Sequence, residues 1–258
     1  MIGRSMKLKI DGHTLDAVLN KPSQGAENQS EAGKKSPILI IIHGFTGEKN
    51  EPHLIAVDKV ARELGFVTLR VDMYGHGASE GQFCDHTLYK WVTDLVEIID
   101  YVASLDFVGD IFLCGHSQGA LCAMMTAGIK HDMIRALLPL SPAWTIPENA
   151  RKGDLLGIRF DPDDIPDRIC LWDDYCIGSN YLRIAQTIYV EPMIEKYTGP
   201  VFIAHGEKDA TIPVEKSHEL SKKYGDCTLV TIPGDTHCFD FHTDLMATAL
   251  HDWLKTVS

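Results

Sequence analysis

The pentapeptide Gly115-His-Ser-Gln-Gly119 holds the side chain with the clearest chemical potential in the chain. It follows the apolar run Ile111–Cys114 and opens a segment of small and apolar residues, Ala120–Gly128. This order of strand, sharp turn and helix, with Ser117 at the tip, is typical of a nucleophile elbow. The helix that begins behind the serine offers backbone N–H groups to an oxyanion. The alternative is a glycine-rich structural turn with a spectator serine.

A serine hydroxyl is a weak nucleophile at neutral pH, so Ser117 needs a base and a third group that orients the base. His237 follows a late strand and precedes the last expected helix. Asp209 directly follows another expected strand and lies between the serine and the histidine in chain order. We therefore predict a catalytic triad of Ser117, Asp209 and His237.

Other residues could take these roles. For Asp209 the alternative is a solvated aspartate in a turn. Asp235, two residues before His237, is expected to cap its loop instead of acting as the acid. Histidines at strand ends more often brace the edge of a sheet than act as a base. The rival bases are His43, His116, His205 and His242.

These residues need a sheet whose strand ends meet at one edge. Apolar runs predict strands at 37–42, 66–71, 111–114, 134–140, 200–204 and 227–232, and periodic or small-residue segments predict helices at 51–64, 86–105, 120–128, 214–224 and 243–257. This alternation indicates an α/β fold with a mostly parallel sheet and helices on both faces. Residues 6–20 predict an edge hairpin around Asp11-Gly12, and the polar residues 21–36 predict a surface loop.

The pattern changes between two of these strands. Four prolines interrupt residues 141–186, and acidic residues crowd 161–174. Such a stretch is expected to lie over the active edge of the sheet as a cap, or lid. We predict one domain over residues 1–258 with a cap insertion at about 143–188.

Composition excludes several classes of partner. The chain has 258 residues and a net charge of −12, which argues against nucleic acid or an anionic membrane as a partner. No apolar run is long enough to cross a bilayer, and the first ten residues lack the features of a secretory signal. The seven scattered cysteines are interpreted as reduced thiols. We expect a cytoplasmic protein, and a homodimer is compatible with the sequence.

The chain resembles the α/β-hydrolase superfamily over nearly its whole length. The motifs that carry this likeness are His43-Gly44, 72–79, 115–119, 205–209 and 234–237. Four stretches are further similar to bacterial cinnamoyl (feruloyl) esterases: His43–Gly47, Gly115–Gly119, Ile165–Arg168 and Gly178–Gln186. The resemblance implies an α/β-hydrolase fold with a cap. It also implies a serine carboxylesterase that hydrolyses small aromatic esters of hydroxycinnamic acids through an acyl-enzyme, without a metal or an organic cofactor.

The same resemblance assigns roles to further residues. The backbone N–H groups of Phe45 and Gln118 match the oxyanion hole. Tyr181 matches a cap position that holds the hydroxyl of the phenolic ring, whereas Asn149 stands where a carboxylate is expected. Trp172 is a candidate to close over the acyl ring. Both Trp172 and Tyr181 could instead pack within the cap.

Other functions stay open at this stage. A general short-chain carboxylesterase or a monoacylglycerol lipase would use the same triad with an aliphatic acyl pocket. A prolyl-type peptidase would need an acidic pair that binds the substrate amine, and no such pair is evident. A binding protein without catalysis would be expected to lack a triad member, and all three are present.

Overall fold

The computed structural model describes residues 3–23, 35–172 and 175–258, with the side chain of Trp172 excepted. Within this part of the chain, eight strands form one sheet in the order β1-β2-β4-β3-β5-β6-β11-β12. From β4 to β12 neighbouring strands are parallel, whereas β2 pairs antiparallel with both β1 and β4. The strands are β1 (Arg4–Ile10), β2 (His13–Asn20), β3 (Ser36–Ile42), β4 (Val67–Val71), β5 (Val108–His116), β6 (Ile134–Leu140), β11 (Val201–Gly206) and β12 (Cys227–Ile232).

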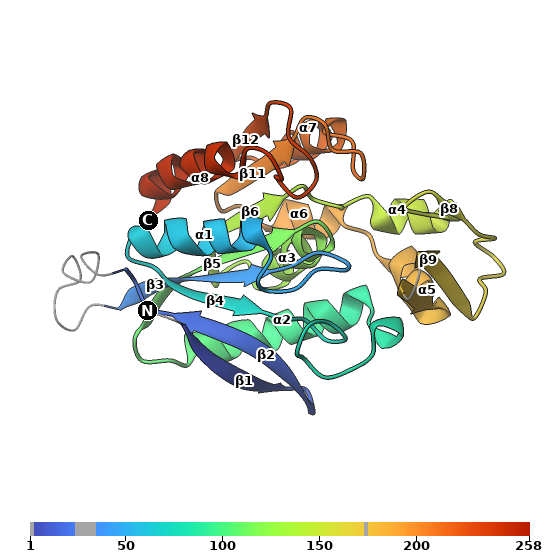
Figure 1. The fold of residues 1–258 in the computed structure, drawn as a ribbon, viewed down its shortest axis with the longest axis horizontal. Coiled ribbons are helices and arrows are strands. Elements are labelled where there is room, and N and C mark those ends of the chain that lie inside the picture. Colours follow the sequence, from blue (N-terminus) through green and yellow to red (C-terminus); the bar gives the residue numbers. More distant parts are fainter. Residues whose placement is uncertain (1–2, 24–34, 173–174) are drawn as a thin grey trace.

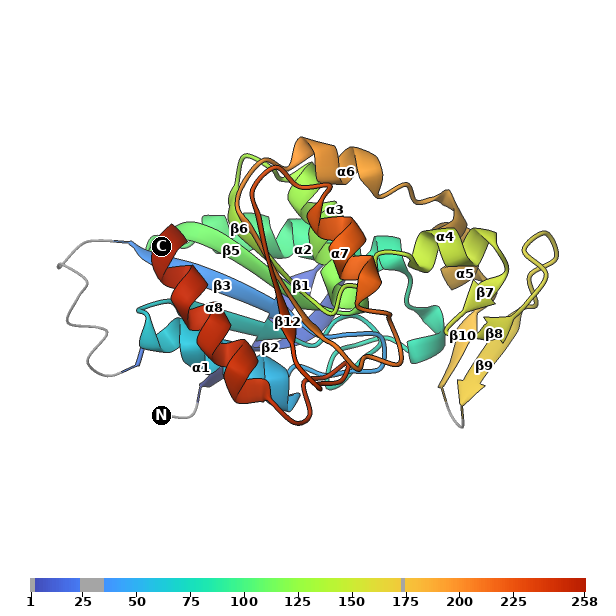
Figure 2. The ribbon, with the colours of Figure 1, turned by 90° about the horizontal axis from the view of Figure 1, so that it is seen from above.

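Helices cover both faces of this sheet (Figures 1 and 2). The helices of the core are α1 (Pro52–Glu63), α2 (Leu88–Ala103), α3 (Gln118–Ile129), α6 (Glu191–Lys196), α7 (Glu215–Ser221) and α8 (Thr243–Val257), with a short 3-10 helix, η2 (Phe83–Asp85). Helix α1 packs beside α8, and α3 contacts both α2 and α6. The predicted fold class, the edge hairpin and the order of the core elements are confirmed. Most of the predicted polar loop, residues 24–34, lies outside the described residues.

The alternation of side chains along β3 explains how one strand supports two apolar layers. Ile38, Ile40 and Ile42 belong to the cluster that includes residues of α2 and α3. Leu39 and Ile41 belong to the cluster that includes residues of α1 and α8. A strand buried on both faces reads as a continuous apolar run, which is why its position was predictable from the sequence.

A separate group of small elements connects β6 to α6 beyond the end of the sheet where its parallel strands terminate (Figure 1). These are α4 (Ile146–Arg151), β7 (Asp154–Leu155), β8 (Ile158–Arg159), β9 (Arg168–Trp172), β10 (Tyr175–Gly178) and α5 (Ser179–Thr187). The strands form two separate two-stranded sheets, β7-β8 and β9-β10. We propose that this segment, residues 143–188, is the cap of a single domain.

Two cysteines in this segment correct a sequence interpretation. Cys170 and Cys176 form a disulfide, so the reading of all seven cysteines as reduced thiols is wrong. The two residues are direct partners in the antiparallel pairing of β9 and β10, which brings their side chains together. The composition could not reveal this pairing because it depends on strand register.

No helix in the described part of the chain combines the length and the apolar character that a membrane span requires.

A buried ion network joins the loop after β3 to the middle of β2 and the end of β4. The Nζ of Lys49 lies 2.5 Å from Oδ2 of Asp72 and 2.7 Å from Oδ2 of Asp16. Oδ1 of Asp72 also accepts a hydrogen bond of 2.7 Å from the N–H of Lys49. Removing Lys49 would leave Asp72 without its buried cation and Asp16 with only the exposed Lys7, which costs more than the ion pair contributes.

We expect Lys49→Met to lower the free energy of unfolding by about 3–5 kcal/mol, because a buried pair is broken by the loss of one partner. Urea denaturation measures this loss. Lys59→Met is the matched control, since the Lys59–Glu63 pair is exposed; it should change stability by less than about 0.5 kcal/mol. Equal effects from the two substitutions would contradict a structural role for the Lys49 network.

Candidate active site

Ser117 lies on a strained turn between β5 and α3. Its backbone has φ 53° and ψ −118°, a conformation that residues with a side chain rarely adopt. Its N–H donates to the carbonyl of Leu140 at 2.9 Å, and its own carbonyl accepts from Ala143 at 3.1 Å. These bonds to the segment around the end of β6 hold the turn in place.

The two glycines of the motif are required by close backbone approach. A Cβ on Gly115 would lie 2.4 Å from the carbonyl oxygen of Gly119. A Cβ on Gly119 would lie 2.2 Å from the carbonyl oxygen of His43. Backbone atoms cannot move aside as a flexible side chain can, so neither position accepts a larger residue.

The structure brings Asp209 and His237 together across the ends of β11 and β12. Nδ1 of His237 donates to Oδ2 of Asp209 at 2.5 Å. Oδ1 of Asp209 accepts from the N–H groups of Thr211 and Ile212 at 2.7 and 2.8 Å. Burial alone would raise the pKa of Asp209, but the hydrogen bonds from His205 and His237 lower it well below its usual value. Asp209 is therefore held as a carboxylate that fixes the His237 ring.

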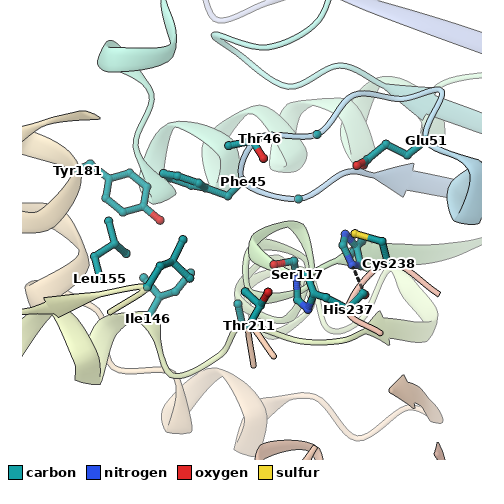
Figure 3. Close-up of a pocket in the computed structure, with 15 residues that line it drawn as sticks. Phe45, Thr46, Glu51, Ser117, Ile146, Leu155, Tyr181, Thr211, His237 and Cys238 are labelled. Carbon is teal, nitrogen blue, oxygen red and sulfur yellow. Dashed lines mark hydrogen bonds between the residues drawn. The ribbon is translucent and has the colours of Figure 1, made fainter. Parts of the chain in front are cut away.

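Ser117 and His237 line the same pocket, where their side chains lie side by side (Figure 3). Among the described hydrogen bonds there is none between Ser117 and His237. Such bonds are often long in the absence of substrate and shorten when it binds. The placement of both side chains in one pocket is compatible with the predicted proton transfer from Ser117 to His237.

The rival histidines make contacts that brace the site. Nε2 of His205 donates to Oδ2 of Asp209 at 2.9 Å, and Nε2 of His116 donates to the carbonyl of His237 at 2.9 Å. His43 accepts from the N–H of Met73 at 2.9 Å, and its pKa is well below the usual value because the ring is buried and His76 lies nearby. His242 stands at the N-cap of α8.

Asp235 caps the loop around His237, as expected. Its Oδ1 accepts from the N–H groups of Thr236 and Phe241, and its Oδ2 accepts from the N–H of His242. All three donors are backbone groups within seven residues of Asp235, so this carboxylate shapes the loop and is not paired with the base.

The backbone N–H groups of Phe45 and Gln118 are available for an oxyanion. Gln118 is the first residue of α3, where N–H groups have no partner within the helix. No described hydrogen bond uses the N–H of either residue. The carbonyl of Phe45 accepts from Nε2 of His76, a bond that fixes the Phe45–Thr46 peptide, which adjoins the peptide that carries the Phe45 N–H. We infer that His76 positions the loop that carries Phe45.

The pocket has two ends of different character. One end is apolar and is formed by Phe45 together with the side chains of Ile146, Leu155 and Tyr181 (Figure 3). Tyr181 is 1% exposed, and its O–H donates to Oε1 of Gln118 at 2.6 Å. Its ring meets the Phe45 ring edge-on at 5.5 Å.

The other end of the pocket, beside His237, is lined by Glu51 and Cys238. Burial, together with the nearby Glu48 carboxylate, raises the pKa of Glu51 to about 7.

Of the two remaining predicted contacts, Asn149 is not among the residues that line this pocket. Asn149 lies on α4 and lines an adjacent pocket with Asp154, Gly157 and Ala210. The two pockets share Ile146, Leu155, Leu156 and Thr211. The side chain of Trp172 lies outside the described residues, so its predicted contact with the acyl ring stays a prediction.

Sequence reasoning did not single out His76 or Glu51. His76 lies in the stretch that follows β4, at the same sheet edge as Ser117, so its position after a parallel strand was a usable signal. Glu51 immediately precedes α1 and is far from Ser117 in sequence. Its place in the pocket depends on tertiary packing and had no sequence signal.

Known proteins share this fold and motif set. The family described as serine aminopeptidase, S33, matches residues 33–159. Est1E from Butyrivibrio proteoclasticus, in a structure with ferulic acid bound, is 50% identical to this chain, with a TM-score of 0.93 and 98% of each chain covered. The mitochondrial palmitoyl-protein thioesterase ABHD10 of Homo sapiens is 30% identical over 214 residues, which are 80% of this chain and 67% of that protein.

A more distant solved structure, that of ABHD10 from mouse, is 19% identical with a TM-score of 0.75, and the match covers 99% of this chain and 100% of that one. At this identity the likeness concerns the fold alone. The relatives of 30% and 50% identity, together with the family match, show that the chain belongs to the α/β-hydrolase superfamily. It is a hydrolase of the serine type.

We expect Gly119→Ala to destabilise the protein by about 1–3 kcal/mol or more, because its Cβ would overlap the His43 carbonyl. The urea midpoint and the turnover of a nitrophenyl ester measure the effect. Gly225→Ala is the control, since a Cβ there meets no atom within 4 Å. A Gly119→Ala protein as stable and active as Gly225→Ala would show that the turn is not closely packed.

We expect His76→Ala to lower kcat about 10- to 100-fold with little change in KM. A displaced Phe45 N–H would stabilise the transition state less, whereas binding of the ground-state substrate would stay the same. His76→Gln, which keeps a donor, should recover part of the loss, and exposed His131→Ala should have no effect. A loss of thermal stability without a loss of kcat would contradict the positioning role.

Proposed function

We propose that this protein is a serine carboxylesterase that hydrolyses hydroxycinnamate (feruloyl or cinnamoyl) esters through an acyl-enzyme. The observation that carries the proposal is the apolar end of the pocket, which is closed by the buried Tyr181 hydroxyl. The 50% identity to Est1E with ferulic acid bound supports the same assignment. An aromatic acyl group would lie between Phe45 and Ile146, with its carbonyl carbon at Ser117.

In the proposed first half-reaction, Ser117 Oγ attacks the ester carbonyl while Nε2 of His237 accepts the serine proton. The carboxylate of Asp209 stabilises the resulting imidazolium through Nδ1. The oxyanion accepts hydrogen bonds from the N–H groups of Phe45 and Gln118, each worth roughly 2.7–4 kcal/mol. The intermediate collapses, the alcohol leaves with the proton of His237, and the acyl group stays on Ser117.

In the second half-reaction, His237 removes a proton from water, which attacks the acyl-enzyme carbonyl. The same N–H groups stabilise the second oxyanion. Collapse returns the proton to Ser117 and releases the cinnamic acid. Every proton is exchanged between substrate, water, Ser117 and His237.

The hydrogen bonds of Tyr181 support recognition of a phenolic ring. Because Tyr181 donates its proton to Gln118, its oxygen keeps a lone pair that can accept from a ring hydroxyl. An aliphatic acyl group would leave this buried oxygen without that donor. The proposal therefore separates hydroxycinnamate esters from esters with an aliphatic acyl group, which a general short-chain esterase or a monoacylglycerol lipase would prefer.

We expect kcat/KM to be higher for methyl ferulate than for nitrophenyl butyrate, with Ser117→Ala as the inactive blank. Tyr181→Phe should lower kcat/KM for methyl ferulate about tenfold, the value of one hydrogen bond, and leave methyl cinnamate unchanged. The exposed Tyr189→Phe is the matched control.

If only butyrate is cleaved, the serine chemistry stands and the hydroxycinnamate assignment fails in favour of a general esterase. Equal losses on methyl ferulate and methyl cinnamate in Tyr181→Phe would show that the tyrosine shapes the pocket and does not read the ring hydroxyl.

A further inference from the structure

Three buried polar atoms converge beside the Ser117 pocket, and the proposed esterase chemistry does not use them. They are Oε2 of Glu51, Nε2 of His53 and Nδ1 of His116, and they all lie within 4.8 Å of one another. None of the three has a hydrogen-bond partner among the described residues. His53 and His116 are only 1% and 2% exposed. Buried polar atoms without partners are rare and costly, so a group that satisfies all three is expected.

The tautomer of His116 is fixed so that a lone pair points into the cluster. Its Nε2 contacts the carbonyl of His237, which can only accept a hydrogen bond, so Nε2 carries the proton. Nδ1 therefore carries no proton and offers a lone pair. A ring N–H held by a backbone carbonyl is also the usual way in which a metal-binding histidine is oriented.

The carboxylate of Glu51 is not used by its own helix. Glu51 occupies the N-cap of α1, but its side chain makes no cap hydrogen bond. Among the described ion pairs, its only partner is the His53 ring, at 4.0 Å. In Figure 3 the side chain extends instead into the pocket, on the side of His237.

Two glycines leave space beside the converging atoms. A Cβ on Gly44 would lie 3.1 Å from Nδ1 of His116, and a Cβ on Gly47 would lie 2.3 Å from Oε2 of Glu51. A side chain at Gly47 would thus displace the carboxylate.

We propose that Glu51, His53 and His116 bind a divalent transition-metal ion of the zinc type, which ties the start of α1 to the turn that carries Ser117. Two imidazole nitrogens and one carboxylate oxygen form a donor set that zinc uses, with a fourth position left for water. Metal–ligand bonds of about 2.0–2.2 Å would draw the three atoms closer together than in this structure. The ion has a structural role, and no step of ester hydrolysis passes through it.

The test is titration of EDTA-treated protein with ZnCl2, followed by calorimetry and thermal unfolding. We expect one zinc ion per wild-type chain and a rise in Tm of at least about 5 °C at saturating zinc. Glu51→Gln and His53→Asn should each weaken binding at least about tenfold. His251→Gln, on the surface of α8, is the matched control and should bind like the wild type. MgCl2 should give no shift, because magnesium prefers oxygen ligands.

The stabilities of the metal-free proteins distinguish a zinc site from a cluster of side chains that only packs in the core. Without zinc, Glu51→Gln should be at least as stable as the wild type, because the amide replaces a carboxylate that has no cation. With saturating zinc, the wild type should be more stable than Glu51→Gln. The proposal is overturned if the wild type takes up no zinc, as expected for a water-filled cluster. It is also overturned if both variants bind zinc as tightly as the wild type.

Discussion

The backbone of Ser117, held at φ 53°, is the constraint on which the rest of the site depends. A residue with a side chain adopts this conformation only when its surroundings fix it, at a cost of roughly 1–3 kcal/mol. Here the surroundings are backbone atoms. Gly119 rests against the carbonyl of His43, and Ser117 itself is bonded to the end of β6. The close approach of β3, β5 and α3 therefore holds the Ser117 hydroxyl next to the backbone N–H of Gln118.

Buried histidines hold the surrounding backbone in a similar way. His116 fixes the carbonyl of His237, His76 fixes the carbonyl of Phe45, and His205 supports the carboxylate of Asp209. Burial lowers the pKa of both His116 and His76, which keeps these rings neutral. A neutral imidazole carries one ring proton and is a directional donor, so these rings can orient the groups that they contact. His237 lines the pocket and also donates to Asp209, so it is the ring placed to exchange protons with a substrate.

The fold was largely predictable from sequence because the parallel strands are uninterrupted apolar runs and the Ser117 motif separates one of them from a helix. The same logic placed Asp209 and His237 after strands that end at a common edge. Prediction from the sequence was less informative where strand register or tertiary packing determines which residues meet. The pairing of Cys170 with Cys176 depends on the alignment of β9 with β10. The place of Asn149 in a neighbouring pocket, which shares Ile146, Leu155, Leu156 and Thr211 with the Ser117 pocket, likewise depends on how the short elements after β6 pack. Glu51, His53 and His116 meet only because α1 begins beside the Ser117 turn.

The claim at the centre of this account is that Ser117 carries the acyl group of a hydroxycinnamate ester during turnover. It is tested most directly by acid-quenching the protein with excess methyl ferulate and locating the modification by mass spectrometry of peptides. We predict a feruloyl group on the peptide that contains Ser117, absent from Ser117→Ala and formed far more slowly in His237→Ala. Turnover without such an adduct, or an adduct on another residue, would contradict the account.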